Sequence, residues 1–518
     1  MKKVLSLVLA LTLALALAIP AGAADLGVIG GADGLTSIVV SGGFDTSAFL
    51  KQQRTEALKA LGGVEGQTNV LLGSKCIAFT DAAPEAKNGR TMVPLRATLE
   101  AMGAQVDYDN AAHAAVVTLG DKSFTHVIGS DVIDFSDGTQ LKMDVASYGT
   151  PSGRTMVPVR FFSQVLGYDV FWDNDYKLVF LLDKDTFIED VDAHFSVLND
   201  FLAKSAKSFD VSKNYREDVD LSGTVKLLDS INGDRSFNYS GKITALLGRD
   251  GMTMTLSADL SRLLELLEST LGSQLPVGYR EALAKPEFSA IFGDRLYLKS
   301  PLLDALMTTA DSESAASGAW YAMDAGTSFS ALYQAMYGGD SQFTVGSLLY
   351  AAMAQGDANH FYAAWSGAVS SAAMLQALYA DELFTRSGST YRCHIGTDTL
   401  AAAMNAAAGQ ELYTADALKA MGIENCSIDL AVRNNGSTEA KCVLDVASDG
   451  ESLLRINYTA SSSGTGAAFK GSVQVRNLCD VTFNASASVR TTKEAVSAAP
   501  AAGETVIELT GAAAQLGG

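Results

Sequence analysis

The sequence reads GRTMVPLR at residues 89–96 and GRTMVPVR at residues 153–160. The two octapeptides agree at seven of eight positions and begin 64 residues apart. A repeat over a distance of this size indicates that one supersecondary unit has been duplicated. We therefore expect two similar structural units in this part of the chain.

Each copy of the octapeptide carries the signals of a turn followed by a helix. Gly89 suits a tight turn, Pro94 suits the first position of a helix, and Gly103 suits a left-handed helix end. The second copy has the same residue types as Gly153, Pro158 and Gly167. Two strand-like segments then follow each helix, at 106–109 and 115–119 and again at 170–173 and 177–180. Each copy thus predicts a turn, a helix and a β-hairpin.

This order of motif, helix, glycine and aromatic hairpin resembles the copper amine oxidase N-terminal domain family over residues 67–183. Tyr108 stands where that family usually has tryptophan. The resemblance implies an attachment or spacer module, of a kind common in secreted proteins of Gram-positive bacteria. It is similar to the stalk of an amine oxidase and not to the catalytic core, so it implies no copper, quinone or other cofactor.

Four arginines belong to the repeated motif: Arg90, Arg96, Arg154 and Arg160. The planar guanidinium group binds carboxylates and phosphates well. Two interpretations stay open. The arginines bind an anionic ligand such as a cell-wall polymer, or each of them fixes its own turn by bonding backbone carbonyls or a nearby carboxylate.

Residues 1–23 have the pattern of a secretory signal peptide. Lys2 and Lys3 precede an apolar run, and Ala21-Gly22-Ala23 provides a cleavage site. The net charge is −20, and loss of the two lysines makes it −22. This charge argues against nucleic-acid binding, and no later stretch is apolar enough to span a bilayer. We expect a secreted protein of the extracellular cell envelope, without a membrane span after cleavage.

The predicted fold class is α+β, with a duplicated stalk-like β/α module followed by a larger domain. Alternating segments such as 442–446 and 481–485 predict a curved antiparallel sheet with one wet face, and residues 300–422 predict a helical insert. This element order resembles lipoprotein carriers, in which a half-barrel holds acyl chains. The expected regions are the signal peptide 1–23, a leader 24–66, the module 67–183, an α+β domain 184–495 and an Ala/Gly-rich tail 496–518.

Met and aromatic residues at helical spacing suggest an apolar groove for a lipid or a peptide, because methionine adapts to varied partners. The candidates are Met336, Tyr337, Met353, Trp365 and Met374. The alternative is that they form ordinary core. Cys426 and Cys442 flank an Asn434-Asn435-Gly436 turn, which suggests that they face each other across a hairpin and form a disulfide. Burial as small apolar residues is the alternative for all five cysteines.

No motif of catalysis or metal binding is found in the sequence. The five histidines form no HExxH or His/Cys cluster, and no GxSxG elbow is present. We predict a non-catalytic binding or scaffolding protein without metal or cofactor, whose partner is a cell-wall polymer or an envelope protein. A lipid is a further candidate ligand. The alternatives are a lipid or lipoprotein carrier and a cell-wall-active enzyme.

Overall fold

The computed structural model describes residues 46–509 except 88, 208–209, 211, 229–232, 263, 266–267, 269–276, 311–317, 324–328, 331–343, 355, 449 and 464–465. The predicted signal peptide lies outside these residues. The chain divides into two compact units. We call residues 30–191 and 352–369 the small unit, and residues 192–351 and 370–518 the large unit. Within the described residues, no helix has both the length and the apolar character needed to cross a membrane.

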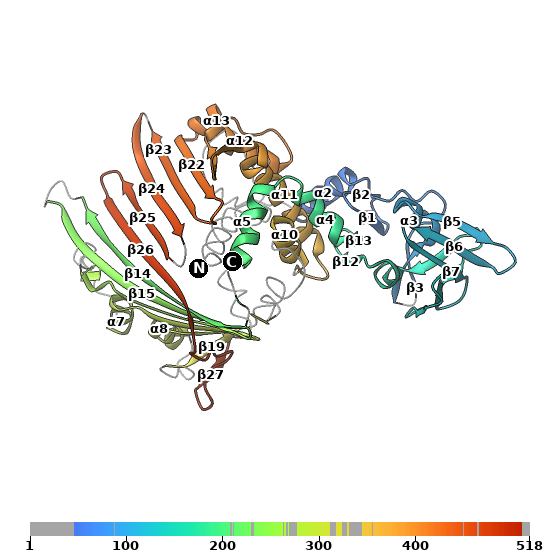
Figure 1. Cartoon of the computed structure of the whole chain (residues 1–518), viewed down its shortest axis with the longest axis horizontal. Helices are drawn as coiled ribbons and strands as arrows, with labels where there is room; N and C mark the ends of the chain where they lie inside the picture. The colour runs from blue at the N-terminus through green and yellow to red at the C-terminus, as the bar shows by residue number, and fades with distance from the viewer. Residues whose placement is uncertain are drawn as a thin grey trace. The chain divides into compact units, whose positions relative to one another are not determined.

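The small unit contains three sheets (Figure 1, blue to cyan). The first has the order β10 (Tyr148–Gly149), β11 (Thr155–Pro158), β4 (Arg90–Pro94), β3 (Glu85–Lys87). The second has the order β12 (Asp169–Asp173), β13 (Leu178–Leu182), β1 (Asn69–Leu72), β2 (Lys75–Cys76). The third has the order β5 (Gln105–Asp109), β6 (Ala114–Leu119), β7 (Lys122–Val127), β8 (Val132–Phe135), β9 (Gln140–Lys142). The predicted leader contains the helix α2 (Thr46–Ala60).

The two octapeptides pair with each other at the centre of the first sheet. β4 and β11 are antiparallel, with Val93 opposite Val157. Both valines are fully buried. Because β3 and β10 flank this pair, the strand order reads the same from either edge. The repeat therefore forms one shared sheet instead of two separate ones.

The two copies differ in the helix that follows the motif. The first forms α3 (Leu95–Ala101), and the second forms a single π-helical turn, η1 (Phe162–Leu166). Phe161 and Phe162 are both fully buried, with ring centroids 5.1 Å apart. Gly103 and Gly167 have φ of 86° and 83°, as predicted for both helix ends.

The start of a long helix, α11 (Phe361–Tyr379), also belongs to the small unit. Asp173 is buried at the end of β12, and its carboxylate accepts a 2.9 Å hydrogen bond from the amide of Tyr362. A carboxylate is favourable at a helix N-terminus, where amides lack partners. Phe361 stacks on Phe171 with ring centroids 3.9 Å apart, and Trp365 packs beside Phe180.

The large unit is built on a curved sheet of fourteen strands (Figure 1). All pairings in it are antiparallel except β19 with β27. Its order is β20 (Phe384–Ser387), β21 (Thr390–Ile395), β22 (Ile423–Arg433), β23 (Thr438–Ser448), β24 (Glu451–Ser463), β25 (Gly466–Val475), β26 (Cys479–Thr492), β14 (Asn214–Leu227), β15 (Arg235–Leu247), β16 (Met252–Asp259), β17 (Glu287–Phe292), β18 (Leu296–Lys299), β19 (Trp320–Met323), β27 (Val506–Glu508). This confirms an α+β fold with a large curved antiparallel sheet.

Several helices of the large unit pack at the β20–β23 end of the sheet. They are the end of α11, α12 (Thr397–Ala408) and α13 (Ala415–Ala420). The carboxylate of Asp381 accepts hydrogen bonds from the amides of Ser196 and Val197 at the start of α5 (Ser196–Lys207). The remaining described helices are α4 (Lys184–Asp192), α7 (Val277–Ala284), α8 (Pro301–Ala310) and α10 (Val345–Ala354).

Two sequence expectations need correction. The predicted helical insert at 300–422 also contains three strands of the sheet, which are β19 and the β20–β21 hairpin. The segment 496–518, for which the sequence predicted only an Ala/Gly-rich tail, contains β27, which pairs in parallel with β19. These strands are short, and their alternation is too brief to distinguish them from loop by pattern alone.

Candidate functional site

The fourteen-stranded sheet has one polar face and one apolar face. In β14, Val219 and Leu221 point to one side, and Asp218 and Asp220 point to the other, because side chains alternate along a strand. The register carries this division across the neighbouring strands. Val219 lies opposite Ala487 of β26 and Ile243 of β15. We call the side that carries Val219 the apolar face.

The apolar face is covered at both ends of the sheet and open in the middle. At one end Cys393 and Leu430 are buried, and at the other end Ala290 and Tyr321 are buried. Between them, the apolar side chains of β24, β25, β26, β14 and β15 are mostly half-buried. Phe469 in β25 is 36% exposed. The middle strands thus offer an incompletely covered apolar surface, which is a common mark of a binding site.

Aromatic rings and a glycine shape this surface. The rings of Tyr458, Phe469 and Phe483 form a row across three strands, with centroids 5.3 and 5.1 Å apart. The ring of Phe483 lies over Gly471, where a Cβ atom would come within 2.5 Å of it. An aromatic ring beside a glycine on the next strand covers backbone that would otherwise be bare.

Buried thiols and phenols lie where the apolar face passes under α11. The thiol of Cys393 donates a 3.4 Å hydrogen bond to the carbonyl of Leu378. Burial raises the pKa of Cys393 to about 11 and that of Tyr458 to about 12. Burial also raises the pKa of Tyr379 far above its ordinary value, with Cys393 and Tyr458 adding to the effect. These groups are protonated and apolar in character at neutral pH.

The two cysteines predicted to face each other do not do so. Leu444 lies opposite Cys426, and Ile428 lies opposite Cys442, so the two thiols are offset diagonally. Both are free. A diagonal pair is separated by more than the ~4 Å between Cβ atoms that a disulfide requires. Both side chains point to the apolar face, and burial raises the pKa of each.

The predicted apolar groove residues are core residues where the structure describes them. Met353 and Trp365 are buried in the small unit, and Met374 is buried in the large unit. Met336 and Tyr337 lie outside the described residues. Helical spacing identified buried residues here, and it could not separate a groove from a core because both require the same apolar stripe.

Three of the four motif arginines are paired with carboxylates. Nε of Arg90 donates a 2.7 Å hydrogen bond to Asp144, and Nη1 of Arg160 lies 3.6 Å from the same carboxylate. Arg154 donates to Asp81 at 2.5 Å. Arg96 is exposed on α3 and has no carboxylate partner among the residues that the structure describes.

The two strongest of these ion pairs are reciprocal. Asp81 precedes Arg90 by nine residues and binds Arg154, whereas Asp144 precedes Arg154 by ten residues and binds Arg90. Arg90 and Arg154, the second residues of the two motifs, are therefore each held by the aspartate that precedes the other motif. Beside them, Lys87 lies 3.3 Å from the ring centroid of Tyr148, whose hydroxyl donates to Glu85. These contacts favour a structural role for Arg90 and Arg154.

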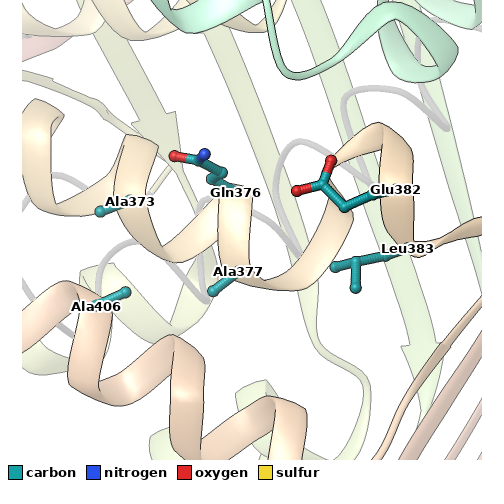
Figure 2. Close-up of a pocket in the computed structure, with 6 residues that line it drawn as sticks. All are labelled: Ala373, Gln376, Ala377, Glu382, Leu383 and Ala406. Atoms are coloured by element: carbon teal, nitrogen blue, oxygen red, sulfur yellow. The ribbon is translucent and has the colours of Figure 1, made fainter. Parts of the chain in front are cut away.

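Two open hollows lie on the large unit. One, of about 360 Å³, is drawn in Figure 2. It is lined by Ala373, Gln376 and Ala377 of α11, Ala406 of α12, and Glu382 and Leu383. The second, of about 520 Å³, lies on the polar face of the sheet and includes Lys441, Asn457, Thr459, Lys470 and Asn484.

In the described ranges, no group of three or more His, Cys, Asp or Glu side chains is placed to hold a metal ion. A comparison with curated proteins found no match. A comparison with protein-family models found a match that covers part of the small unit. Residues 71–181, which contain both octapeptides and the reciprocal ion pairs, match the copper amine oxidase N-terminal domain.

Proposed function

We propose that this protein is an exported, non-catalytic binding protein of the cell envelope. In this proposal the large unit binds the acyl chain of a lipid or of a lipidated partner on its apolar face. The module at 71–181 attaches the protein to the envelope. We further propose that this module arose by duplication, because the two octapeptides pair about Val93 and Val157 and exchange their ion pairs.

The observation that carries the proposal is the half-covered middle of the apolar face. Each methylene group that such a surface removes from water contributes about 0.8 kcal/mol. About ten buried methylenes then contribute about 8 kcal/mol, which corresponds to a micromolar dissociation constant before the costs of association. The row of Tyr458, Phe469 and Phe483 provides flat apolar contacts along which a flexible chain could lie.

A lipid or lipoprotein carrier is the second candidate. It is favoured by the curvature of the sheet, because a half-barrel with one apolar face resembles the acyl-chain site of lipoprotein carriers (Figure 1). A carrier differs from a scaffold in releasing its ligand to an acceptor. Transfer of a fluorescent phospholipid between two vesicle populations, with and without the protein, distinguishes the two.

Native mass spectrometry of residues 24–518 with a lipid extract of a Gram-positive membrane tests ligand binding. A bound lipid mass that survives desalting supports the proposal. An apo mass only, for protein that is folded by circular dichroism, contradicts it. If lipid is absent and a protein partner is retained on immobilised residues 24–518, the apolar face is an interface between proteins.

Attachment is tested separately by sedimentation with purified cell walls. We expect Arg96→Ala to reduce co-sedimentation without changing the melting temperature, since Arg96 has no carboxylate partner among the described residues. Arg90→Ala is the matched control, because it removes a paired arginine of the same motif. If both variants bind walls as the parent protein does, these arginines do not form the attachment site.

A further inference from the structure

We infer that Glu217 gives the apolar face a preference for amphiphiles in which a cationic amine is attached to a long alkyl chain. This inference rests on the proposed binding of alkyl chains by the large unit. It adds the chemical class of the ligand and the residue that selects it.

Glu217 is a carboxylic acid on the apolar face. It lies two residues before Val219 in β14, and the register places it opposite Ala245 and Val489. Among the described residues of this face in β23–β26 and β14–β16, it is the one carboxylate. Its side chain is half-buried, and burial raises its pKa.

The next residue, Asp218, is a carboxylate that does have hydrogen-bond partners. Asp218 points to the polar face, where it accepts hydrogen bonds from Arg216 at 3.0 Å and Arg490 at 2.8 Å. Glu217 has no hydrogen-bond or ion-pair partner among the described residues. Both arginines lie on the opposite face of the sheet, so they cannot reach it. A half-buried carboxylate that no described side chain pairs with costs folding free energy, and such groups cluster at functional sites.

The surroundings of Glu217 indicate what its partner is. From Glu217 to Gly223, which pairs with Phe483, the apolar face extends over six residue steps of β14. Six residues of extended strand span about 20 Å, which exceeds the ~15 Å thickness of one hydrocarbon leaflet of a bilayer. The neighbouring strand carries the small side chains of Ala485 and Ala487 along this stretch, and these leave room for a ligand on the apolar face. An alkyl chain fits along it with its polar end at Glu217.

The charge of that polar end follows from the carboxylate. An ammonium group donates charge-assisted hydrogen bonds to an ionised carboxylate, whereas a hydroxyl group makes a weaker neutral bond and a second carboxylate is repelled. Removal of the ammonium group from water costs free energy, and on this face an ion pair with Glu217 offsets that cost. The face therefore favours an alkylamine over an alcohol of the same chain length.

The test measures the binding of dodecylamine and dodecan-1-ol to residues 24–518 by isothermal titration calorimetry. For the parent protein we expect the amine to bind at least about tenfold more tightly than the alcohol, as is typical of hydrogen bonds to charged groups. Glu217→Gln should abolish this preference, so that the two amphiphiles bind this variant with similar affinity. Asp220→Asn, which removes a carboxylate from the polar face of the same strand, should keep the preference.

The outcomes separate this inference from the proposal on which it rests. Equal affinities for the two amphiphiles, or a preference that survives Glu217→Gln, overturn the role of Glu217 and leave alkyl-chain binding intact. Binding of neither amphiphile overturns both. Glu217→Gln is expected to melt at or above the temperature of the parent protein, because it removes a charge that no described residue pairs with. A thermal melt of the variant, measured beside the titration, verifies that it is folded.

Discussion

Replacement of Gly471 by alanine tests whether Phe483 packs over this glycine on the apolar face. A Cβ atom at residue 471 would lie 2.5 Å from the ring of Phe483 and 2.5 Å from the backbone carbonyl of Asn457. Real Cβ atoms do not approach other atoms so closely, so the ring has to move and the strands have to separate slightly. Overpacking of this kind costs about 1–3 kcal/mol.

A cost of about 2 kcal/mol lowers the melting temperature of a unit of this size by about 4–8 °C. The assay is differential scanning calorimetry, which records the thermal unfolding of residues 24–518. Gly466→Ala in the same strand is the control, because the nearest atom to its Cβ lies 3.7 Å away. We expect this control to match the parent protein or to exceed it slightly in stability, since alanine restricts the unfolded chain.

The same substitution in a Phe483→Leu protein separates the contact with the ring of Phe483 from the contact with the carbonyl of Asn457. In a Phe483→Leu protein, the alanine at 471 no longer meets the ring, and only the carbonyl of Asn457 opposes it. The cost of Gly471→Ala should therefore be smaller there than in the parent protein. If Gly471→Ala melts within 1 °C (about 0.3 kcal/mol) of the parent protein, the ring does not lie over this glycine and the described surface is wrong.

Three further predictions concern other sites. In a double-mutant cycle, Arg90→Ala and Asp144→Ala should be coupled by up to about 1 kcal/mol, because the pair is partly exposed; purely additive changes in unfolding free energy would argue against a structural ion pair. Cys393 should react with iodoacetamide at pH 8 about a hundredfold more slowly than in the unfolded chain, because burial raises its pKa to about 11 and only the thiolate reacts; equal rates by peptide mapping would contradict its burial. The pKa of Asp445 is lowered, first by the hydroxyl of Ser452, so its contribution to stability is present above the unfolded pKa of ~4 and is lost as the pH falls through its lower folded pKa. Asp445→Asn should therefore show a smaller fall in melting temperature between pH 7 and pH 3 than the parent protein, and an equal fall would exclude this carboxylate as a source of acid sensitivity.

Local signals in the sequence located the small unit well. The octapeptides at 89–96 and 153–160 marked the family match at 71–181, and Gly103 and Gly167 marked both helix ends. These features depend on a few consecutive residues, whose backbone preferences act whatever the rest of the chain does. The same local rules missed the π-helical turn at Phe162–Leu166, because Pro158 and Gly167 mark where a helical segment starts and stops and not its hydrogen-bond pattern.

The candidate site was less accessible to sequence reasoning. Alternation in residues 215–221 already placed Glu217 on the side of Val219 and Leu221, and this was the available signal. It could not indicate that Glu217 has no partner among the residues that the structure describes, because a partner could have come from any distant strand. The groove residues predicted from helical spacing were buried core where they are described, since an apolar stripe has the same spacing in either case.

The sequence by itself determined the repeat, the α+β class and the two-faced character of the long strands, because periodicity and turn chemistry are local. Only the tertiary structure decided which strands are neighbours. β14 lies beside β26, with Asn214 opposite Thr492, and Asp81 meets Arg154 of the other motif. Such pairings are chosen by the burial and hydrogen bonding of the whole sheet, summed over residues far apart in the chain. They determine the incompletely covered middle of the apolar face and the position of Glu217 on it, away from the charged side chains of the opposite face.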